Sequence, residues 1–167
     1  MIRPVLFLPH PVLGRPCEKV DVIDDVARAL AADLLDTMRA SAHSVGVAAP
    51  QIGVSLRAFC LDVRGHPKAR SSHGEVVLLN PELVEATAAP AETGREGCMS
   101  VPDLTGDVAR APLVVLRGLT PEGEERELEM DAFEARAAQH ELDHLDGLLF
   151  LDRLVAAERV FRRRSYR

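Results

Sequence analysis

The sequence predicts an α+β fold in which antiparallel sheets pack around a central helix, with further helices toward both ends of the chain. Segments with helical spacing and helix-end signals flank several short runs rich in apolar and β-branched residues. The connections between those runs are too short for parallel crossovers, which favours antiparallel pairing. The 167 residues suffice for one hydrophobic core, so we expect residues 1–167 to form a single domain.

The first predicted element is a helix over residues 25–40. Its apolar residues recur at helical spacing, namely Val26, Leu30, Leu34 and Met38. Asp24 and Asp25 stand where an N-cap belongs. Residues 44–53 are rich in small side chains and show no clear period. We expect a loop or an irregular strand there, in which the backbone approaches a site closely.

Several strands are expected next. They lie at residues 56–63, 75–79, 82–87, 113–119 and 125–130. Turn-forming residues separate them, including Asn80-Pro81, Thr93-Gly94 and Pro121-Glu122-Gly123.

The central helix is predicted over residues 132–146. Asp131 and Glu134 have the spacing of a capping box, and Gly147 follows where a C-cap belongs. A shorter helix is expected over residues 155–164. Together with the first helix, these segments complete the α part of the predicted fold.

Composition and charge narrow the class of protein. No apolar run approaches the roughly 20 residues of a membrane helix, and no signal-peptide pattern is present, so we expect a cytoplasmic protein without a membrane partner. The cysteines are odd in number and widely spaced, which favours free or metal-bound thiols over disulfides. The net charge of −6 argues against DNA binding. Residues 158–167 are basic, and they either contact a polyanion or form a solvated helix end.

The central helix carries the motif His140-Glu141-Leu142-Asp143-His144. Residues four apart lie on one helical face, so both imidazoles can reach one metal ion. Glu141 is rotated by about 100° from His140, which suits contact with a water on that ion better than ligation. The alternative is a pair of partly exposed histidines beside a solvated glutamate.

A catalytic zinc-type ion usually has three protein ligands and one water, so the motif needs a third ligand. The metzincin pattern would place it at position 150, but Phe150 cannot bind a metal. A carboxylate on a later helix is one option, with Glu158 as the candidate. A cysteine is the other option. Cys60 has the setting of a buried strand residue, whereas Cys98 follows a turn and Gly97 would let the backbone approach a site.

Three segments agree with one family, and they occur in the family's order: SVGVAAPQ at 44–51, EGCMS at 96–100 and QHELDH at 139–144. The chain resembles the bacterial peptide deformylases, and its short spacings resemble their type 1 branch. The resemblance extends over nearly the whole chain, which implies one deformylase-like catalytic domain. Ser44 stands where the family usually has glycine. Met99 replaces the more usual leucine with an apolar side chain of similar volume.

The resemblance also implies roles for individual residues. The metal ligands would be Cys98, His140 and His144. Glu141 would be general base and acid, while Gln51 and the backbone N–H of Met99 would donate to the carbonyl oxygen under attack. One divalent ion is implied, iron(II) in the cell, with zinc or nickel in isolated protein. The implied reaction is hydrolysis of N-formyl-methionyl peptides to formate and a free N-terminus.

We expect a pocket for the methionine side chain on the helix face that carries His140. Phe133, Arg136 and Ala137 precede it by seven, four and three residues, and Val45 could join them. The alternative is that Phe133 and Ala137 are plain core residues. The full predicted substrate-binding set is Val45, Gly46, Gly97, Phe133, Arg136 and Ala137.

The motifs leave two alternatives to deformylation. An endoprotease with the same helix motif would cleave internal peptide bonds without preferring a formyl group. A structural metal site, or a degenerate non-catalytic relative, would need neither Glu141 nor Gln51, because neither is a ligand. The implied partners are nascent N-formyl-methionyl peptides and the ribosome. The basic side chains for ribosomal RNA would be Arg159, Arg162, Arg163, Arg164 and Arg167.

Overall fold

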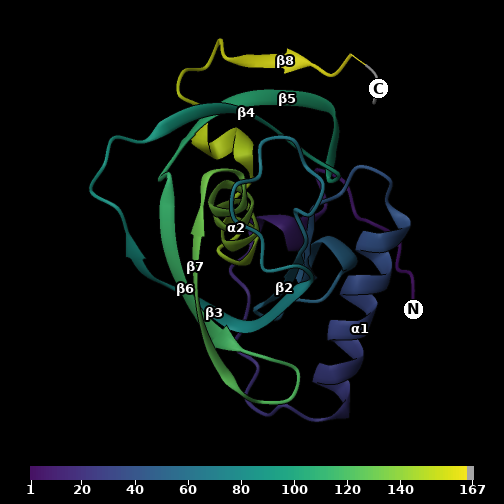
Figure 1. Ribbon diagram of the computed structural model, residues 1–167. Helices are drawn as coiled ribbons and strands as arrows, with labels where there is room; N and C mark the ends of the chain where they lie inside the picture. Colours follow the sequence, from purple (N-terminus) through teal and green to yellow (C-terminus); the bar gives the residue numbers. More distant parts are fainter. Residues whose placement is uncertain (165–167) are drawn as a thin grey trace.

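Two antiparallel sheets surround one long helix in the computed structural model, which describes residues 1–164 (Figure 1). The larger sheet has the order β1-β2-β3-β6-β7, and the smaller has the order β4-β5-β8. The strands are β1 (Gly46–Ala48), β2 (Ala58–Leu61), β3 (Val76–Ala86), β4 (Glu92–Cys98), β5 (Val101–Arg110), β6 (Leu113–Leu119), β7 (Glu125–Asp131) and β8 (Val160–Arg162). The helices are α1 (Asp25–Ala40), α2 (Ala132–Leu145) and the 3-10 turns η1 (Pro11–Gly14), η2 (Ala49–Ile52) and η3 (Phe150–Arg153).

Helix α2 lies at the centre of the fold, as predicted. Figure 1 shows it nearly end-on, with β4 and β5 on one side and β3, β6 and β7 on the other. Ala135, Ala138 and Leu145 are fully buried in one apolar cluster with Phe59 and Leu116 of the larger sheet. The small alanines let the helix approach the sheet closely, and each large buried side chain stabilises the fold by about 1.5–3 kcal/mol. The helix is therefore a firm support for functional side chains.

Helix α1 covers the other face of β1 and β2. The Asp24 carboxylate accepts hydrogen bonds from two N–H groups of the first turn, which confirms the predicted start. Leu34 and Met38 pack in a second cluster with Val47 of β1, whereas the next residue, Ala48, belongs to the cluster around α2. Alternate residues of β1 thus face the two helices, which fixes this short strand between them.

The predicted capping box of α2 does not form, although the helix begins where expected. The Asp131 carboxylate accepts the N–H of Ser71 at 2.9 Å instead. The buried Glu134 carboxylate accepts the Ser71 hydroxyl at 2.6 Å and the His73 N–H at 2.8 Å. Partners distant in sequence have replaced the local ones. The two carboxylates consequently hold the loop of residues 62–75 against α2.

The strands differ from the prediction in three respects. The two strands expected around Asn80-Pro81 form one strand, β3, because the Asn80 amide pairs with both backbone groups of Val20 and a register shift absorbs the irregularity. Thr93-Gly94 is not a turn, since both residues lie inside β4. Strands β4 and β5, which pair with each other, were not predicted as strands.

The helix predicted over residues 155–164 is wrong. Residues 155–158 form bends and turns, and residues 160–162 form strand β8, which pairs with β5. The Phe161 ring lies 3.9 Å from the Arg95 guanidinium and 5.7 Å from that of Arg159, so cation–π contacts favour the extended form. Arg167 of the predicted basic segment lies outside the described residues.

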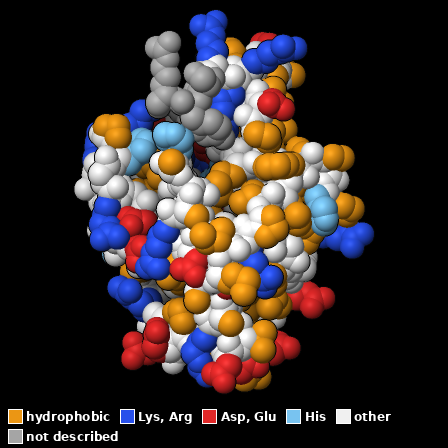
Figure 2. Space-filling view, turned by 90° about the vertical axis from the view of Figure 1, so that its right-hand side faces the viewer, with side chains coloured by type: hydrophobic (Ala, Val, Ile, Leu, Met, Phe, Trp, Pro, Cys, Tyr) orange, Lys and Arg blue, Asp and Glu red, His pale blue; other side chains and the backbone are white. Residues whose placement is uncertain are grey.

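The surface combines charged and apolar regions. Figure 2 shows a face on which charged side chains of both signs surround an area rich in apolar ones. Among residues 1–164, no helix has the length and apolar character that a membrane crossing requires.

Candidate metal centre

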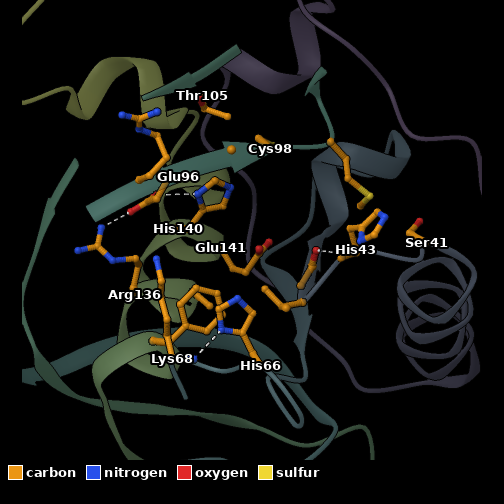
Figure 3. A pocket seen from close by; sticks show the side chains of 18 of the residues that line it. Ser41, His43, His66, Lys68, Glu96, Cys98, Thr105, Arg136, His140 and Glu141 are labelled. Carbon is orange, nitrogen blue, oxygen red and sulfur yellow. Dashed lines mark hydrogen bonds and ion pairs between the residues drawn. The ribbon is translucent and has the colours of Figure 1, made fainter. Parts of the chain in front are cut away.

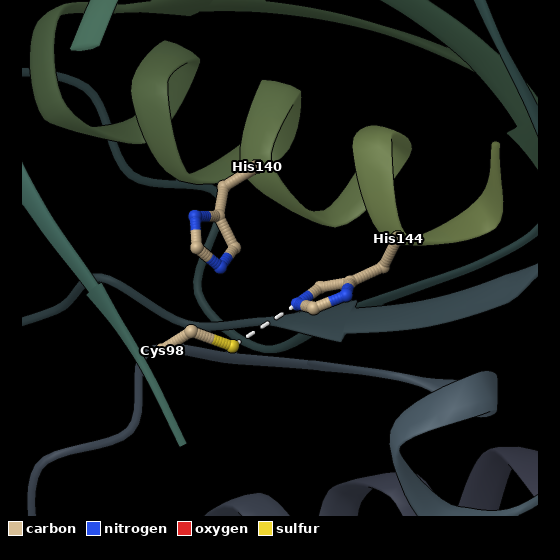
Figure 4. Close-up of side chains that lie close together, drawn as sticks. All are labelled: Cys98, His140 and His144. Atoms are coloured by element: carbon tan, nitrogen blue, oxygen red, sulfur yellow. Dashed lines mark hydrogen bonds between the residues drawn. The ribbon is translucent and has the colours of Figure 1, made fainter. Parts of the chain in front are cut away.

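Three side chains from distant parts of the chain meet beside α2. His140 and His144 lie one turn apart with ring centroids 5.0 Å from each other, and Cys98 ends strand β4 (Figure 4). The Cys98 Sγ lies 3.3 Å from His144 Nε2, and one ligand atom from each residue falls within 4.8 Å of the others. Ligands of one tetrahedral ion, at about 2.3 Å for sulfur and 2.0–2.1 Å for nitrogen, lie roughly 3.3–3.6 Å apart. The 3.3 Å separation of Cys98 Sγ from His144 Nε2 falls in this range.

The electrostatics also suit a thiolate ligand. Burial opposes ionisation of the Cys98 thiol, but the imidazoles of His144 and His140 outweigh it and hold its pKa well below the usual value. The thiolate is the form that binds metal. Glu158, the alternative third ligand, is exposed and is not part of this group. The donor set that the chain offers is therefore one sulfur and two nitrogens.

Glu96 orients His140. Its carboxylate lies 2.8 Å from His140 Nδ1, so the other ring nitrogen, Nε2, is left for a metal (Figure 3). The same carboxylate accepts two hydrogen bonds from Arg110, each 2.9 Å long, and one from Arg136 at 2.8 Å. Burial alone would raise the pKa of Glu96, but the bonds from His140 and Arg110 hold it well below the usual value. Glu96 therefore stays charged.

Glu141 lies beside the ligand group without a fixed partner. Its side chain is buried, and its Oε2 has no hydrogen-bond partner among the described residues. Burial raises the pKa of this carboxyl to about 7. A Cβ on Gly46 would lie 2.6 Å from Glu141 Oε1, so only glycine leaves room for this carboxylate. A buried, unpartnered oxygen needs a polar partner, and a metal-bound water would provide one.

Gln51 brings an amide to the same place. The residue lies in η2, and its Oε1 accepts the N–H of Ala48 at 2.9 Å, which fixes the amide orientation. Its Nε2 is 3.4 Å from Cys98 Sγ and 3.2 Å from Ser100 Oγ. A neutral donor thus lies next to the ligand group, inside the buried part of the site.

A cavity of about 580 Å³ opens onto this group. Its size is typical of a small-ligand site. The predicted catalytic residues Gln51, Met99 and Glu141 line it. So do all the predicted substrate-binding residues, namely Val45, Gly46, Gly97, Phe133, Arg136 and Ala137. Phe133 and Ala137 are therefore wall residues of a cavity as well as members of the core.

The loop of residues 62–75 also contributes to the site, although its sequence did not predict this. His66 stacks on Phe133 with centroids 3.6 Å apart and an interplanar angle of 4°, and Lys68 follows it at the cavity wall (Figure 3). Other unpredicted lining residues are Ser41, Ala42, His43, Arg95, Thr105 and Arg163. The one signal available in the sequence was a long polar segment between two strands, and such segments often carry function.

The fold and this site together define a class, the metal-dependent hydrolases whose histidine ligands and acid–base glutamate share one helix. Residues 2–160 match the family model described as Polypeptide deformylase. The chain belongs to the peptide deformylase family.

Related proteins match over nearly their full length. Peptide deformylase from Natranaerobius thermophilus is 44% identical over 91% of this chain and 90% of its own. Peptide deformylase 1 from Bacillus subtilis is 40% identical over 92% of this chain and 90% of its own. The crystal structure of peptide deformylase from Thermotoga maritima covers 93% of this chain and 99% of its own, at 31% identity and a TM-score of 0.84. The Met-Ala-Ser-bound enzyme from Acinetobacter baumannii covers 92% and 99%, at 35% identity and the same TM-score.

Proposed function

We propose that this chain removes the formyl group from the N-terminal formyl-methionine of new polypeptides and releases formate. The observation that carries the proposal is the Glu141 carboxylate beside the Cys98, His140 and His144 group, in a member of a metal-dependent hydrolase family. The buried Glu141 Oε2 has no hydrogen-bond partner in the described part of the chain. The similar Acinetobacter baumannii structure holds Met-Ala-Ser, the peptide that remains when the formyl group is removed from formyl-Met-Ala-Ser. Neither the endoprotease nor the non-catalytic alternative is supported by the relatives.

The proposed ligands are Cys98, His140 and His144. When bound, the ion supplies Lewis-acid activation of a water molecule. Glu141 accepts a proton from this water and passes it to the leaving amine, since its buried Oε2 has no hydrogen-bond partner within residues 1–164. Glu96 keeps the His140 ring in the ligating orientation through their 2.8 Å contact.

Two donors stabilise the oxygen of the attacked carbonyl in this proposal. Gln51 provides Nε2, held in place through the contact of its Oε1 with the Ala48 N–H. The backbone N–H of Met99, next to the Cys98 ligand and at the cavity wall, provides the second donor. Removing one donor of this type typically costs about 10²–10³ in rate.

The methionine side chain would lie against Phe133, Ala137 and Val45 in the cavity. Arg136 donates to Glu96 at 2.8 Å and to the Val108 carbonyl at 2.9 Å, so its charged end is occupied and its methylenes can complete an apolar wall. An unbranched apolar side chain fits these surroundings.

One sulfur and two nitrogen ligands suit iron(II), zinc or nickel, and we propose iron(II) as the ion used in the cell and zinc or nickel as those in isolated protein. We further propose that the chain works in the cytoplasm on nascent peptides.

The ribosome is the proposed second partner, through basic side chains near β8. Arg162 and Arg164 are exposed and available for phosphate contacts, whereas Arg159 is paired with Asp107 at 2.6 Å. Replacing Arg162 and Arg164 by glutamate should weaken ribosome cosedimentation and reduce its salt dependence. Binding that is unchanged by this double variant would exclude this role for the two arginines.

The function is tested by formate release from formyl-Met-Ala-Ser with anaerobically metal-loaded protein. We expect release by the native chain and by Glu122→Ala, a surface control, and a loss of at least about 10²-fold in Glu141→Ala. Cleavage between the alanine and the serine would instead indicate an endoprotease. No formate from metal-loaded native protein would refute the proposal.

A further inference from the structure

A second cavity adjoins the first and makes its outer part strongly basic. It has a volume of about 430 Å³ and shares Lys68, Arg95, Phe133 and Arg136 with the first cavity. Six basic side chains line the two cavities, namely Lys68, Arg70, Arg95, Arg110, Arg136 and Arg163. The acidic residues that line them are Glu92, Glu96 and Glu141. The chain as a whole has a net charge of −6, so this balance is opposite to that of the molecule.

Most of these charges already have internal partners. Arg110 and Arg136 are held by Glu96, and Arg95 is held by Asp107. Lys68, by contrast, forms no ion pair with any residue in the described part of the chain, and it lines both cavities. Arg70 is likewise unpaired within residues 1–164 but lines only the second cavity, together with the exposed Glu92.

The backbone of Lys68 is also held in position. Its backbone N–H donates to His66 Nδ1 at 3.2 Å, and His66 stacks on Phe133 of α2. A few residues further on, the buried Glu134 binds Ser71 and His73. The loop is thus attached to α2 on both sides of Lys68, which reduces the backbone entropy lost when Lys68 binds a partner. Figure 3 shows Lys68 and Arg136 on the same side of the pocket, with His140 beyond them.

We propose that Lys68 makes this chain select formylated peptides that carry an acidic side chain one or two residues after the formyl-methionine. The inference rests on the proposed function. With the formyl group at the Cys98, His140 and His144 group and the methionine against Phe133, the rest of the peptide leaves through the outer part of the cavity. Lys68 lines both cavities there and forms no ion pair within residues 1–164, so it attracts a substrate carboxylate and repels a substrate lysine.

The test compares kcat/KM for formyl-Met-Glu-Ser, formyl-Met-Gln-Ser and formyl-Met-Lys-Ser, and for the set with the same changes at the third residue. We expect the glutamate peptide to exceed the lysine peptide by about three- to tenfold in at least one set, mainly through KM, with the ratio falling at high salt. Lys68→Glu should reverse the ratio, and Lys68→Arg should keep it. Lys19→Glu changes the other lysine, which pairs with Glu82 at 3.3 Å outside both cavities, and should leave the ratio unchanged.

The glutamine peptides separate the two proposals, because their hydrolysis depends on the proposed function but not on charge selection. If they are not hydrolysed, the function fails, and calorimetric binding of Met-Glu-Ser and Met-Lys-Ser then tests selection alone. Equal values for acidic and basic peptides in both sets, or a ratio unchanged by Lys68→Glu, would overturn the inference.

Discussion

Gly46 shows how a single missing side chain shapes this site. The residue belongs to β1, where Val47 and Ala48 fix the strand between the two helices. The backbone at Gly46 therefore cannot shift away from Glu141. A Cβ would lie 2.6 Å from Glu141 Oε1 and 2.9 Å from its carboxyl carbon. Glycine is therefore needed here for close approach and not for a left-handed turn.

Gly46→Ala should displace the Glu141 carboxylate and lower kcat for formate release by about 10²-fold, because small misplacements of acid–base groups have effects of that size. Gly14→Ala is the matched control, since a Cβ at Gly14 meets nothing within 4 Å. Steady-state kinetics and thermal unfolding of both variants provide the measurement. If Gly46→Ala keeps the kcat of the control, Glu141 does not depend on this space.

At the scale of elements, a buried ionic network joins β4, β5 and α2 behind the metal ligands. Arg110 of β5 bonds to Glu96 of β4 at 2.9 Å and to Asp143 of α2 at 2.6 Å. All three side chains are less than one-tenth exposed. Since His140 also bonds to Glu96, the network connects the smaller sheet to one of the proposed ligands.

Arg110→Met should leave two buried carboxylates short of a cation and lower the free energy of unfolding by about 3–5 kcal/mol. Zinc affinity should also fall by about 10–100-fold, because His140 loses its fixed orientation. Chemical denaturation and a zinc competition assay measure the two effects. Arg117→Met, in an exposed pair with Glu127, should cost less than about 1 kcal/mol, and an equally small loss for Arg110→Met would contradict this role.

The elements that could be predicted from sequence are those with local signals. Asp24 and the apolar repeat define α1, and the spacing of His140 and His144 on α2 brings their imidazoles together. Sequence patterns gave wrong or no predictions where contacts between residues far apart in the chain determine the secondary structure. Strands β4 and β5 contain glycines at their pairing positions, which weakens the strand pattern in the sequence. Strand β8 is extended because it pairs with β5 and because two arginines contact the Phe161 ring. His66 and Lys68 could not be predicted as wall residues because their place depends on contacts with Phe133 and Glu134.

For the whole molecule, the proposed metal would tie the two sheets together through the central helix. Cys98 belongs to the smaller sheet, while α2 packs mainly in the apolar cluster of the larger one. A ligand that binds only the folded state stabilises it by about 2.7 kcal/mol at a hundred times its Kd. The metal would therefore have a structural effect in addition to its proposed chemical one.

X-ray absorption spectroscopy of zinc-loaded protein would show whether Cys98, His140 and His144 bind one ion together. We expect one sulfur at about 2.3 Å and at least two nitrogens at about 2.0–2.1 Å. Cys98→Ser should remove the sulfur shell, whereas Cys60→Ser, a change to a buried thiol outside the group, should leave it intact. A spectrum without sulfur in the native protein, or one that Cys98→Ser leaves unchanged, would mean that Cys98 does not bind the ion.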